Sequence, residues 1–199
     1  MNLHQRDYWI FDMDGTLTIA VHDFDAIRAT LGLPSGQPIL ETVAKLPAAE
    51  AEAIYRRLDE IELELARDST PQAEAKALLH GLRQRGATLG ILTRNSVLNA
   101  HETLKACGLL DFFEPACILG RESVAAPKPD PDGIHKLLTH WNAPPNEAVM
   151  VGDYLFDLEA GRKAGVATVH LDVNGDGGWP DHTDFRVQNL SELLKLAVG

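Results

Sequence analysis

Four short segments of the chain are largely apolar and are followed by polar residues. Each is four or five residues long and rich in β-branched, aromatic or aliphatic side chains, which is typical of buried strands in a parallel sheet. The chain turns polar after them at Asp12, Thr93, Gly152-Asp153 and Asp172. We therefore predict strands at Tyr8–Phe11, Thr88–Leu92, Ala148–Val151 and Ala167–Leu171.

Between these segments the apolar residues recur with helical spacing, and the ends of the helices are marked. Pro71 opens one pattern, Asn95 or Ser96 can cap another, and Gly86, Gly108 and Gly165 stand where helices should end. We predict helices over about 71–85, 96–107, 131–141 and 154–165. Strands that alternate with helices predict an α/β fold, a doubly wound parallel sheet that binds ligands at the carboxyl ends of its strands.

One stretch, residues 18–69, contains no strand candidate. Helical patterns cover 24–31, 39–45 and 47–67, and Pro47 suits the first turn of the longest. We predict a small helical cap over 18–70, inserted after the first strand, and an α/β core made of 1–17 and 71–199.

The most informative polar pair is Asp12 and Asp14, which follows the first strand. In an extended chain, residues two apart point the same way, so both carboxylates can face one cleft. Two close carboxylates repel unless a cation or a proton is shared. The pair could also be two aspartates at a strand end that face water, but Gly15 directly after them indicates a tight turn of the backbone.

Further charged residues fall at the same edge of the predicted sheet. Asp153 follows the third strand, and Asp157 lies about one helical turn later. Several carboxylates together are a hard-oxygen set suited to Mg²⁺. Lys128 lies between Pro127 and Pro129, so its loop is stiff and can present a fixed positive charge; the other interpretation is an ordinary surface lysine.

These segments, in this order, resemble the four motifs of the haloacid dehalogenase-like (HAD) hydrolase superfamily. They are Asp12-Met13-Asp14-Gly15-Thr16, then Thr93, Lys128, and Gly152-Asp153 with Asp157. The chain looks most similar to subfamily I, the phosphoglycolate-phosphatase-like group, in which a helical cap follows the first motif. The resemblance implies a Rossmann-like core, a hydrolase acting on phosphoric monoester bonds, and Mg²⁺ as cofactor.

The resemblance also implies roles for individual residues. Asp12 would attack phosphorus and carry an aspartyl-phosphate, and Asp14 would act as acid and then as base. Thr93 and the backbone N–H of Arg94 would hold phosphate oxygens, and Lys128 would act in catalysis by steadying both the nucleophile and the transferring phosphate. The implied metal ligands are Asp12, the carbonyl of Asp14, Asp153 and, directly or through water, Asp157. Asp14 distinguishes the chain from the dehalogenases, which lack the second aspartate.

The resemblance leaves the substrate and the acceptor open. The substrate would be a small phosphomonoester, phosphoglycolate-like or sugar-phosphate-like. A phosphotransferase or phosphoglucomutase-like enzyme would use the same site with a sugar hydroxyl in place of water, and a HAD-fold binding protein without turnover is a third reading. Two departures, Tyr154 in place of a small residue and Thr18-Ile19-Ala20 after the first motif, concern contacts near the metal and at the cap hinge.

Charge and composition limit the partners. The 199 residues carry 18 basic and 29 acidic side chains, a net charge of -11, which argues against a nucleic-acid or anionic-membrane partner. The cap has ten acidic and five basic residues, so a small ester suits it better than a large polyanion. With two cysteines, no signal-peptide pattern and no long apolar run, we expect a cytoplasmic protein with reduced thiols.

A glycine-rich loop and three single side chains have less specific interpretations. Asp172–Gly177 begins like a calcium-binding EF-hand loop but has Thr183 where the bidentate Glu is due, so we read it as a loop rich in Gly and Asp. His22 could reach the substrate, although a surface role is more common. Trp179 could close over the cleft, and Arg94 could contact either the substrate or the cap.

Overall fold

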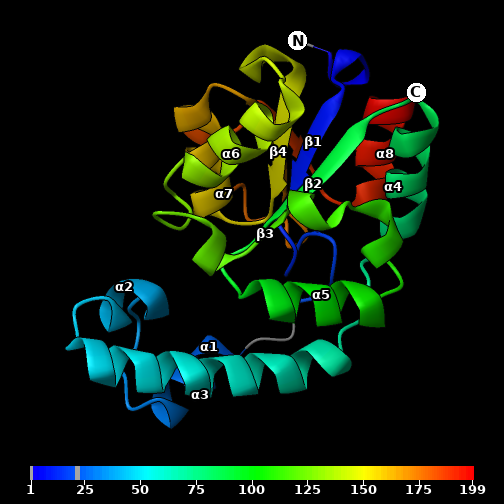
Figure 1. Cartoon of the computed structure of the whole chain (residues 1–199). Helices are drawn as coiled ribbons and strands as arrows, with labels where there is room; N and C mark the ends of the chain where they lie inside the picture. The colour runs from blue at the N-terminus through cyan, green and yellow to red at the C-terminus, as the bar shows by residue number, and fades with distance from the viewer. Residues whose placement is uncertain (1, 21–22) are drawn as a thin grey trace.

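The computed structural model describes residues 2–20 and 23–199, and in this part of the chain six parallel strands form one sheet (Figure 1). Their order is β3-β2-β1-β4-β5-β6. The strands are β1 (Tyr8–Phe11), β2 (Thr88–Leu92), β3 (Ile118–Leu119), β4 (Ala148–Gly152), β5 (Ala167–Leu171) and β6 (Phe185–Val187). The predicted α/β class is confirmed. The pattern of apolar residues does not predict β3 and β6, the two edge strands, which have two and three residues.

The register of the central strand fixes where the polar residues lie. Phe11 of β1 pairs with Ile91 of β2 on one side and with Val151 of β4 on the other. The N–H of Asp12 continues this pairing by donating to the carbonyl of Val151 at 2.9 Å. Because all three strands are parallel, Asp12 and the residues that follow β2 and β4 leave the sheet at the same edge.

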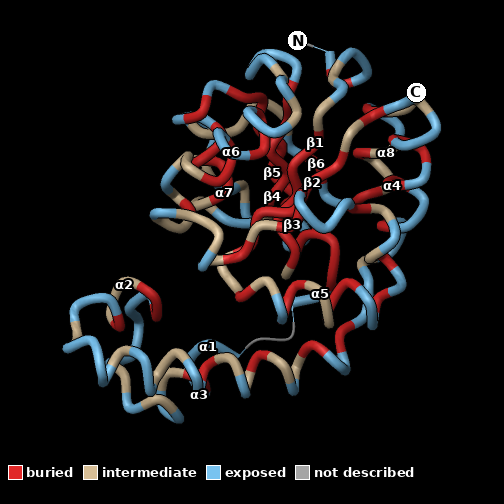
Figure 2. Tube along the Cα trace, viewed as in Figure 1, coloured by how far each residue is buried: buried red, intermediate tan, exposed pale blue. Residues whose placement is uncertain are grey.

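Alternate residues of β1 serve two hydrophobic cores, one on each face of the sheet. Trp9 and Phe11 belong to the core under α4 (Ala75–Gln84), α5 (Val97–Ala106) and α8 (Leu190–Val198). Ile10 belongs to the core under α6 (Asp132–Trp141) and α7 (Leu155–Ala164). Figure 2 shows the buried residues concentrated in the strands between these two helical layers.

The insertion after β1 contains α1 (Phe24–Thr30), α2 (Ile39–Val43) and α3 (Ala48–Arg67). These helices lie apart from the sheet in Figure 1 and share their own hydrophobic cluster, made of Ile27, Ile39, Leu40, Val43 and Leu58. The long helix α3 packs beside α5 of the core. We keep the name cap for residues 18–70, and this division of the chain remains our proposal.

One predicted boundary is wrong. Pro71 does not open α4, because its backbone instead bridges antiparallel to Thr18. The helix begins at Ala75, after Glu74 adopts a left-handed conformation with φ of 65°. The residues around Pro71 are compatible with a helix start and with a β-bridge. The bridge depends on Thr18, which is distant in the sequence, so the local pattern could not predict it.

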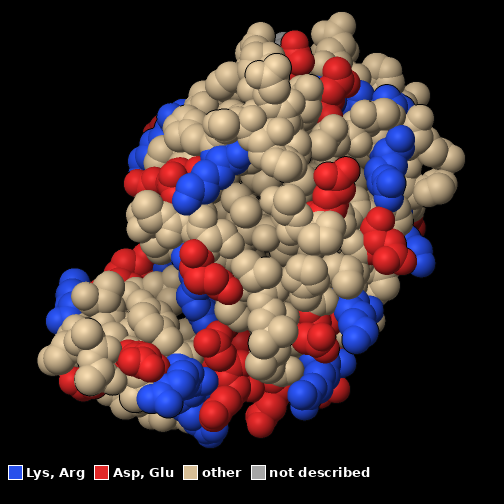
Figure 3. Space-filling model, viewed as in Figure 1, with Lys and Arg blue, Asp and Glu red and all other residues tan. Residues whose placement is uncertain are grey.

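Short 3₁₀ turns complete the described part of the chain, at Leu3–Gln5, Leu110–Phe112, Pro115–Cys117, Arg121–Ser123, Pro145–Glu147 and Pro180–His182. Cys107 and Cys117 are buried free thiols, as predicted. Within the described residues, every helix is too short or too polar to cross a membrane. On the face in Figure 3, acidic and basic side chains are interspersed rather than gathered in a basic patch.

Candidate active site

Asp12 and Lys128 form the centre of the site. Lys128 is 3% exposed, and its Nζ lies 2.5 Å from Oδ1 of Asp12 and 2.6 Å from Oδ1 of Asp157. Burial alone would lower the pKa of Lys128, but Asp12 and Asp157 outweigh it and the pKa is raised. The ordinary surface lysine considered from the sequence is therefore excluded: the ammonium is buried, charged and shared between two carboxylates.

A third carboxylate, Asp153, faces the same point. The hydroxyl of Thr16 lies 3.4 Å from Oδ2 of Asp12 and 3.3 Å from Oδ1 of Asp153, so it can donate to either. Gly15 makes this approach possible. Its φ is 81°, and a Cβ there would overlap the Asp153 carboxylate.

The carboxylates of Asp12, Asp153 and Asp157 place ligand oxygens within 4.8 Å of one another. Burial, followed by repulsion from Asp12 and Asp157, raises the pKa of Asp153 to about 8. Burial also raises the pKa of Asp157 to about 6, although Lys128 opposes this shift. Such crowding is costly without a cation, and an all-oxygen donor set suits a hard divalent ion. The cluster could therefore hold a metal.

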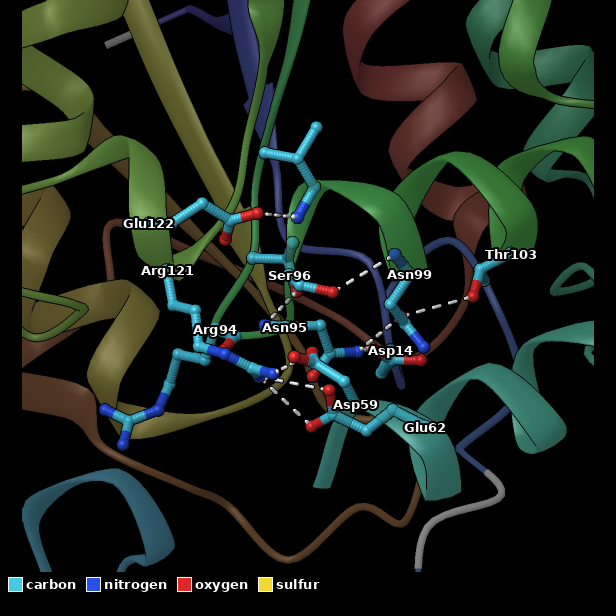
Figure 4. Close-up of polar contacts among 12 residues, drawn as sticks. Asp14, Asp59, Glu62, Arg94, Asn95, Ser96, Asn99, Thr103, Arg121 and Glu122 are labelled. Carbon is cyan, nitrogen blue, oxygen red and sulfur yellow. Dashed lines mark hydrogen bonds and ion pairs between the residues drawn. The ribbon is translucent and has the colours of Figure 1, made fainter. Parts of the chain in front are cut away.

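Asp14 is close enough to Asp12 for their charges to interact, and it meets a partner that the sequence did not single out. Nδ2 of Asn95 donates to Oδ2 of Asp14 at 2.7 Å, and also lies 3.0 Å from Oδ1 of Asn99 (Figure 4). Burial, then the charges of Asp12 and Glu62, raise the pKa of Asp14 to about 7. Ser96 is the N-cap residue of helix α5, because its Oγ accepts a hydrogen bond from the N–H of Asn99. The side chain of Asn95 is therefore available to Asp14.

Thr93 and Arg94 follow β2 at the same edge. Thr93 is buried, its N–H donates to the carbonyl of Leu119 at 3.0 Å, and its hydroxyl accepts from the N–H of Asn95 at 3.1 Å. The Arg94 guanidinium donates to both carboxylate oxygens of Glu41 in the cap, at 2.8 and 2.7 Å, and to the carbonyl of Lys128. Of the two roles considered for the Arg94 side chain, contact with the cap is the one observed.

A second arginine joins the cap to the core. Arg121 donates to Glu62 at 3.0 Å and to Asp59, both on α3 (Figure 4). Glu62 is only 6% exposed, and burial raises its pKa to about 7 even though Arg121 opposes the shift. No local signal in the sequence marks Arg121 or Glu62, because their contact depends on how the cap folds back over the core.

A cavity of about 610 Å³ lies between cap and core. Glu41, Tyr55 and Asp59 line it from the cap, and Ser96, Arg121 and Pro127 line it from the core. Pro127 directly precedes Lys128, and Ser96 follows Asn95. The cavity is thus next to the cluster of aspartates.

Local contacts are described for two of the three remaining sequence signals. The Asp172 carboxylate accepts from the N–H groups of Gly175, Asp176 and Gly177 and pairs with Arg186, which supports the loop interpretation over a calcium site. Trp179 packs edge-on against Tyr154, with ring centroids 5.3 Å apart. His22 lies outside the described residues.

Comparison with known proteins decides the family. A family model described as haloacid dehalogenase-like hydrolase matches residues 19–171. The chain belongs to this family. The HAD-like hydrolases are enzymes, and the expectation drawn from the four motifs is confirmed at this level.

Relatives of this HAD-like hydrolase extend over almost the whole chain. A haloacid dehalogenase-like hydrolase domain-containing protein of Arabidopsis thaliana is 33% identical, covering 94% of this chain and 82% of its own length. The pyrophosphatase PpaX of Listeria innocua is 28% identical, covering 94% of each.

Solved structures share the fold. A hydrolase from Pseudomonas syringae superposes with a TM-score of 0.80 at 23% identity, over 96% of this chain and all of its own. CbbY of Rhodobacter sphaeroides, solved in complex with xylulose-(1,5)bisphosphate, superposes with a TM-score of 0.75 at 20% identity, over 96% of this chain and 99% of its own.

Proposed function

We propose that this HAD-like hydrolase is a Mg²⁺-dependent phosphatase that cleaves a small phosphomonoester through an aspartyl-phosphate on Asp12. The observation that carries the proposal is the contact of Asp12 with a buried lysine, with ligand oxygens of Asp153 and Asp157 within 4.8 Å and with Asp14 close enough for its charge to interact with that of Asp12. Two similar proteins add support: PpaX is named a pyrophosphatase, and the structure of CbbY holds a sugar bisphosphate.

Asp12 and Asp153 would hold the metal, together with the carbonyl of Asp14. Asp157 already contacts Lys128 through Oδ1 and the N–H of Tyr154 through Oδ2 at 3.2 Å, so a role through water suits it best. Bound Mg²⁺ would offset the negative charge of the carboxylates and of the phosphate. The proposed metal ligands from Asp12, Asp14 and Asp153 are all oxygen atoms, and the three residues follow strands at the carboxyl edge of the sheet.

In the first step, a carboxylate oxygen of Asp12 attacks phosphorus, and the bond from phosphorus to the ester oxygen breaks. The leaving oxygen takes a proton from Asp14, whose pKa of about 7 keeps a protonated fraction available near neutral pH. Lys128 donates to Asp12 and meets the growing charge on the phosphate. Thr93 and the N–H of Arg94 bind the other phosphate oxygens.

In the second step, Asp14 is ionised and takes a proton from water, and the oxygen of that water attacks phosphorus. The bond between Asp12 and phosphorus breaks, which releases phosphate and restores the free carboxylate. Closure of the cap over the core would keep bulk water from the first step.

The direct test is Asp12→Asn with p-nitrophenyl phosphate and Mg²⁺. We expect turnover to fall to background, because the amide is a poor nucleophile. Asp181→Asn, a change of the same kind at an exposed aspartate, is the control and should keep wild-type turnover. Wild-type turnover in Asp12→Asn would contradict the mechanism.

A further inference from the structure

The cavity between cap and core is linked to Asp14 through the residues that line it. Arg121, which lines the cavity, contacts Glu62, and the charge of Glu62 acts on Asp14. Asp14 is the residue that we propose protonates the leaving oxygen. The alcohol part of the substrate would therefore extend from Asp14 into this cavity.

Negative charge dominates the walls of the cavity. Glu41, Asp59 and Glu122 line it together with a single lining cation among the described residues, Arg121. Its apolar walls include Leu40, Tyr55 and Val124, which can pack against carbon but offer no charge.

The cations near the cavity are already paired. Arg121 binds Asp59 and Glu62, and Arg94, just behind the wall, binds both oxygens of Glu41. With Glu62 and Arg94 included, four carboxylates face two guanidinium groups, a net charge of -2 when all are ionised. A second anionic group on the substrate would have to displace a carboxylate of the cap to gain a partner.

We propose that this cavity selects phosphomonoesters whose leaving alcohol carries no anionic group, and that it discriminates against a second phosphate or a carboxylate. The inference rests on the proposed phosphatase function and narrows its substrate class. Hydroxyl groups can donate to the carboxylates on the cavity wall, and an amine would be attracted by them. A carboxylate in the same place meets the net negative charge of the wall in a partly buried space, where Coulomb repulsion is several times stronger than in water.

Three esters of nearly equal size test the proposal. Phosphoglycolate, 2-hydroxyethyl phosphate and phosphoethanolamine differ chiefly in the charge of the leaving alcohol, which is negative, neutral and positive. With Mg²⁺, we expect kcat/KM for 2-hydroxyethyl phosphate to exceed that for phosphoglycolate by about tenfold or more. Phosphoethanolamine should equal or exceed the neutral ester.

Two neighbouring residues of α3 provide a matched pair of variants. Asp59 lines the cavity, whereas Glu60 is exposed and pairs with Arg57 on the outer surface. Asp59→Asn should narrow the ratio of kcat/KM between neutral and anionic esters several-fold, because it removes one negative charge from the wall and one of the two carboxylates that pair with Arg121. Glu60→Gln removes the same charge and should leave the ratio as in the wild type. Glu122→Gln, at another position on the cavity wall, should act like Asp59→Asn and serves if Asp59→Asn does not fold.

The outcomes separate the two proposals. If p-nitrophenyl phosphate is hydrolysed but phosphoglycolate is used as well as or better than the neutral ester, or none of the three esters is used, the charge selection is wrong and the phosphatase proposal stands. An equal ratio in Asp59→Asn and Glu60→Gln also overturns the selection. Absence of Mg²⁺-dependent hydrolysis of p-nitrophenyl phosphate overturns both.

Discussion

Asn95 donates from Nδ2 to Oδ2 of Asp14 at 2.7 Å and thereby fixes the carboxyl group that we propose as acid and base. The same nitrogen lies 3.0 Å from Oδ1 of Asn99, which also lies 3.5 Å from the hydroxyl of Thr103. Asp14 is thus held by a chain of amide and hydroxyl groups along α5 (Figure 4).

Replacing Asn95 with Ala should impair hydrolysis in a way that depends on the leaving group. Loss of the hydrogen bond to Asp14 should lower kcat for an alkyl phosphate by about tenfold. The burst of p-nitrophenol from p-nitrophenyl phosphate should change less, since this leaving group needs little protonation. The measurement is a comparison of single-turnover rates for the two esters, with Asn99→Ala as a milder control. Equal losses for both esters would speak against a role through Asp14.

Lys128→Met should destabilise the fold as well as abolish activity. The substitution leaves Asp12 and Asp157 buried without their shared cation, and breaking a buried ion pair from one side costs about 3–5 kcal/mol. Urea unfolding measures the loss. Lys136→Met, which removes an exposed lysine paired with Asp132, should cost under about 1 kcal/mol. Equal stability of the two variants would contradict the central position of Lys128.

Glu62 should make stability depend on pH. Its pKa rises from 4.5 to about 7 on folding, mainly through burial, so the folded state binds a proton more tightly than the unfolded chain. The free energy of unfolding therefore falls as pH rises from about 4.5 to about 7. Above this window Glu62→Gln should be more stable than the wild type, by an amount of the order of 3 kcal/mol, and below it the difference should vanish. Thermal or urea unfolding of both proteins across this range tests the sign. A Glu62→Gln variant that is more stable than the wild type only at low pH would contradict it.

Mg²⁺ should stabilise the protein more at high pH than at low pH. The pKa of Asp153 is raised to about 8 and that of Asp157 to about 6, so protons compete with a cation for these groups. The rise in melting temperature on adding Mg²⁺ should therefore be larger near pH 8 than near pH 6. Asp153→Asn should reduce the effect, and an effect independent of pH and of Asp153 would place the ion elsewhere.

The aspartates and Lys128 could be predicted from the sequence because each follows a strand, lies in the first turn of the next helix, or lies in a stiff loop at one edge of the sheet. The parallel topology alone then brings them together. Asn95 looked like a helix cap, a role that Ser96 takes instead. Arg121 and Glu62 gave no signal, since they meet only when α3 packs back over the core.

The start of α4 shows the same limit at the level of the fold. Pro71 carries a valid helix-start signal, yet its backbone pairs with Thr18, far away in the sequence. Local patterns predicted the four central strands and most of the long helices, whereas the edge strands and the contacts between cap and core depend on long-range packing that no short pattern records.

The covalent role of Asp12 is tested most directly by the burst of p-nitrophenol in Asp14→Asn. This leaving group departs without an acid, but release of phosphate from Asp12 needs Asp14 as base. We predict that the variant releases one equivalent of p-nitrophenol per site, then stalls with phosphate on Asp12, detected by mass spectrometry of the quenched protein. Steady turnover without a burst, or phosphate on a residue other than Asp12, would contradict the account.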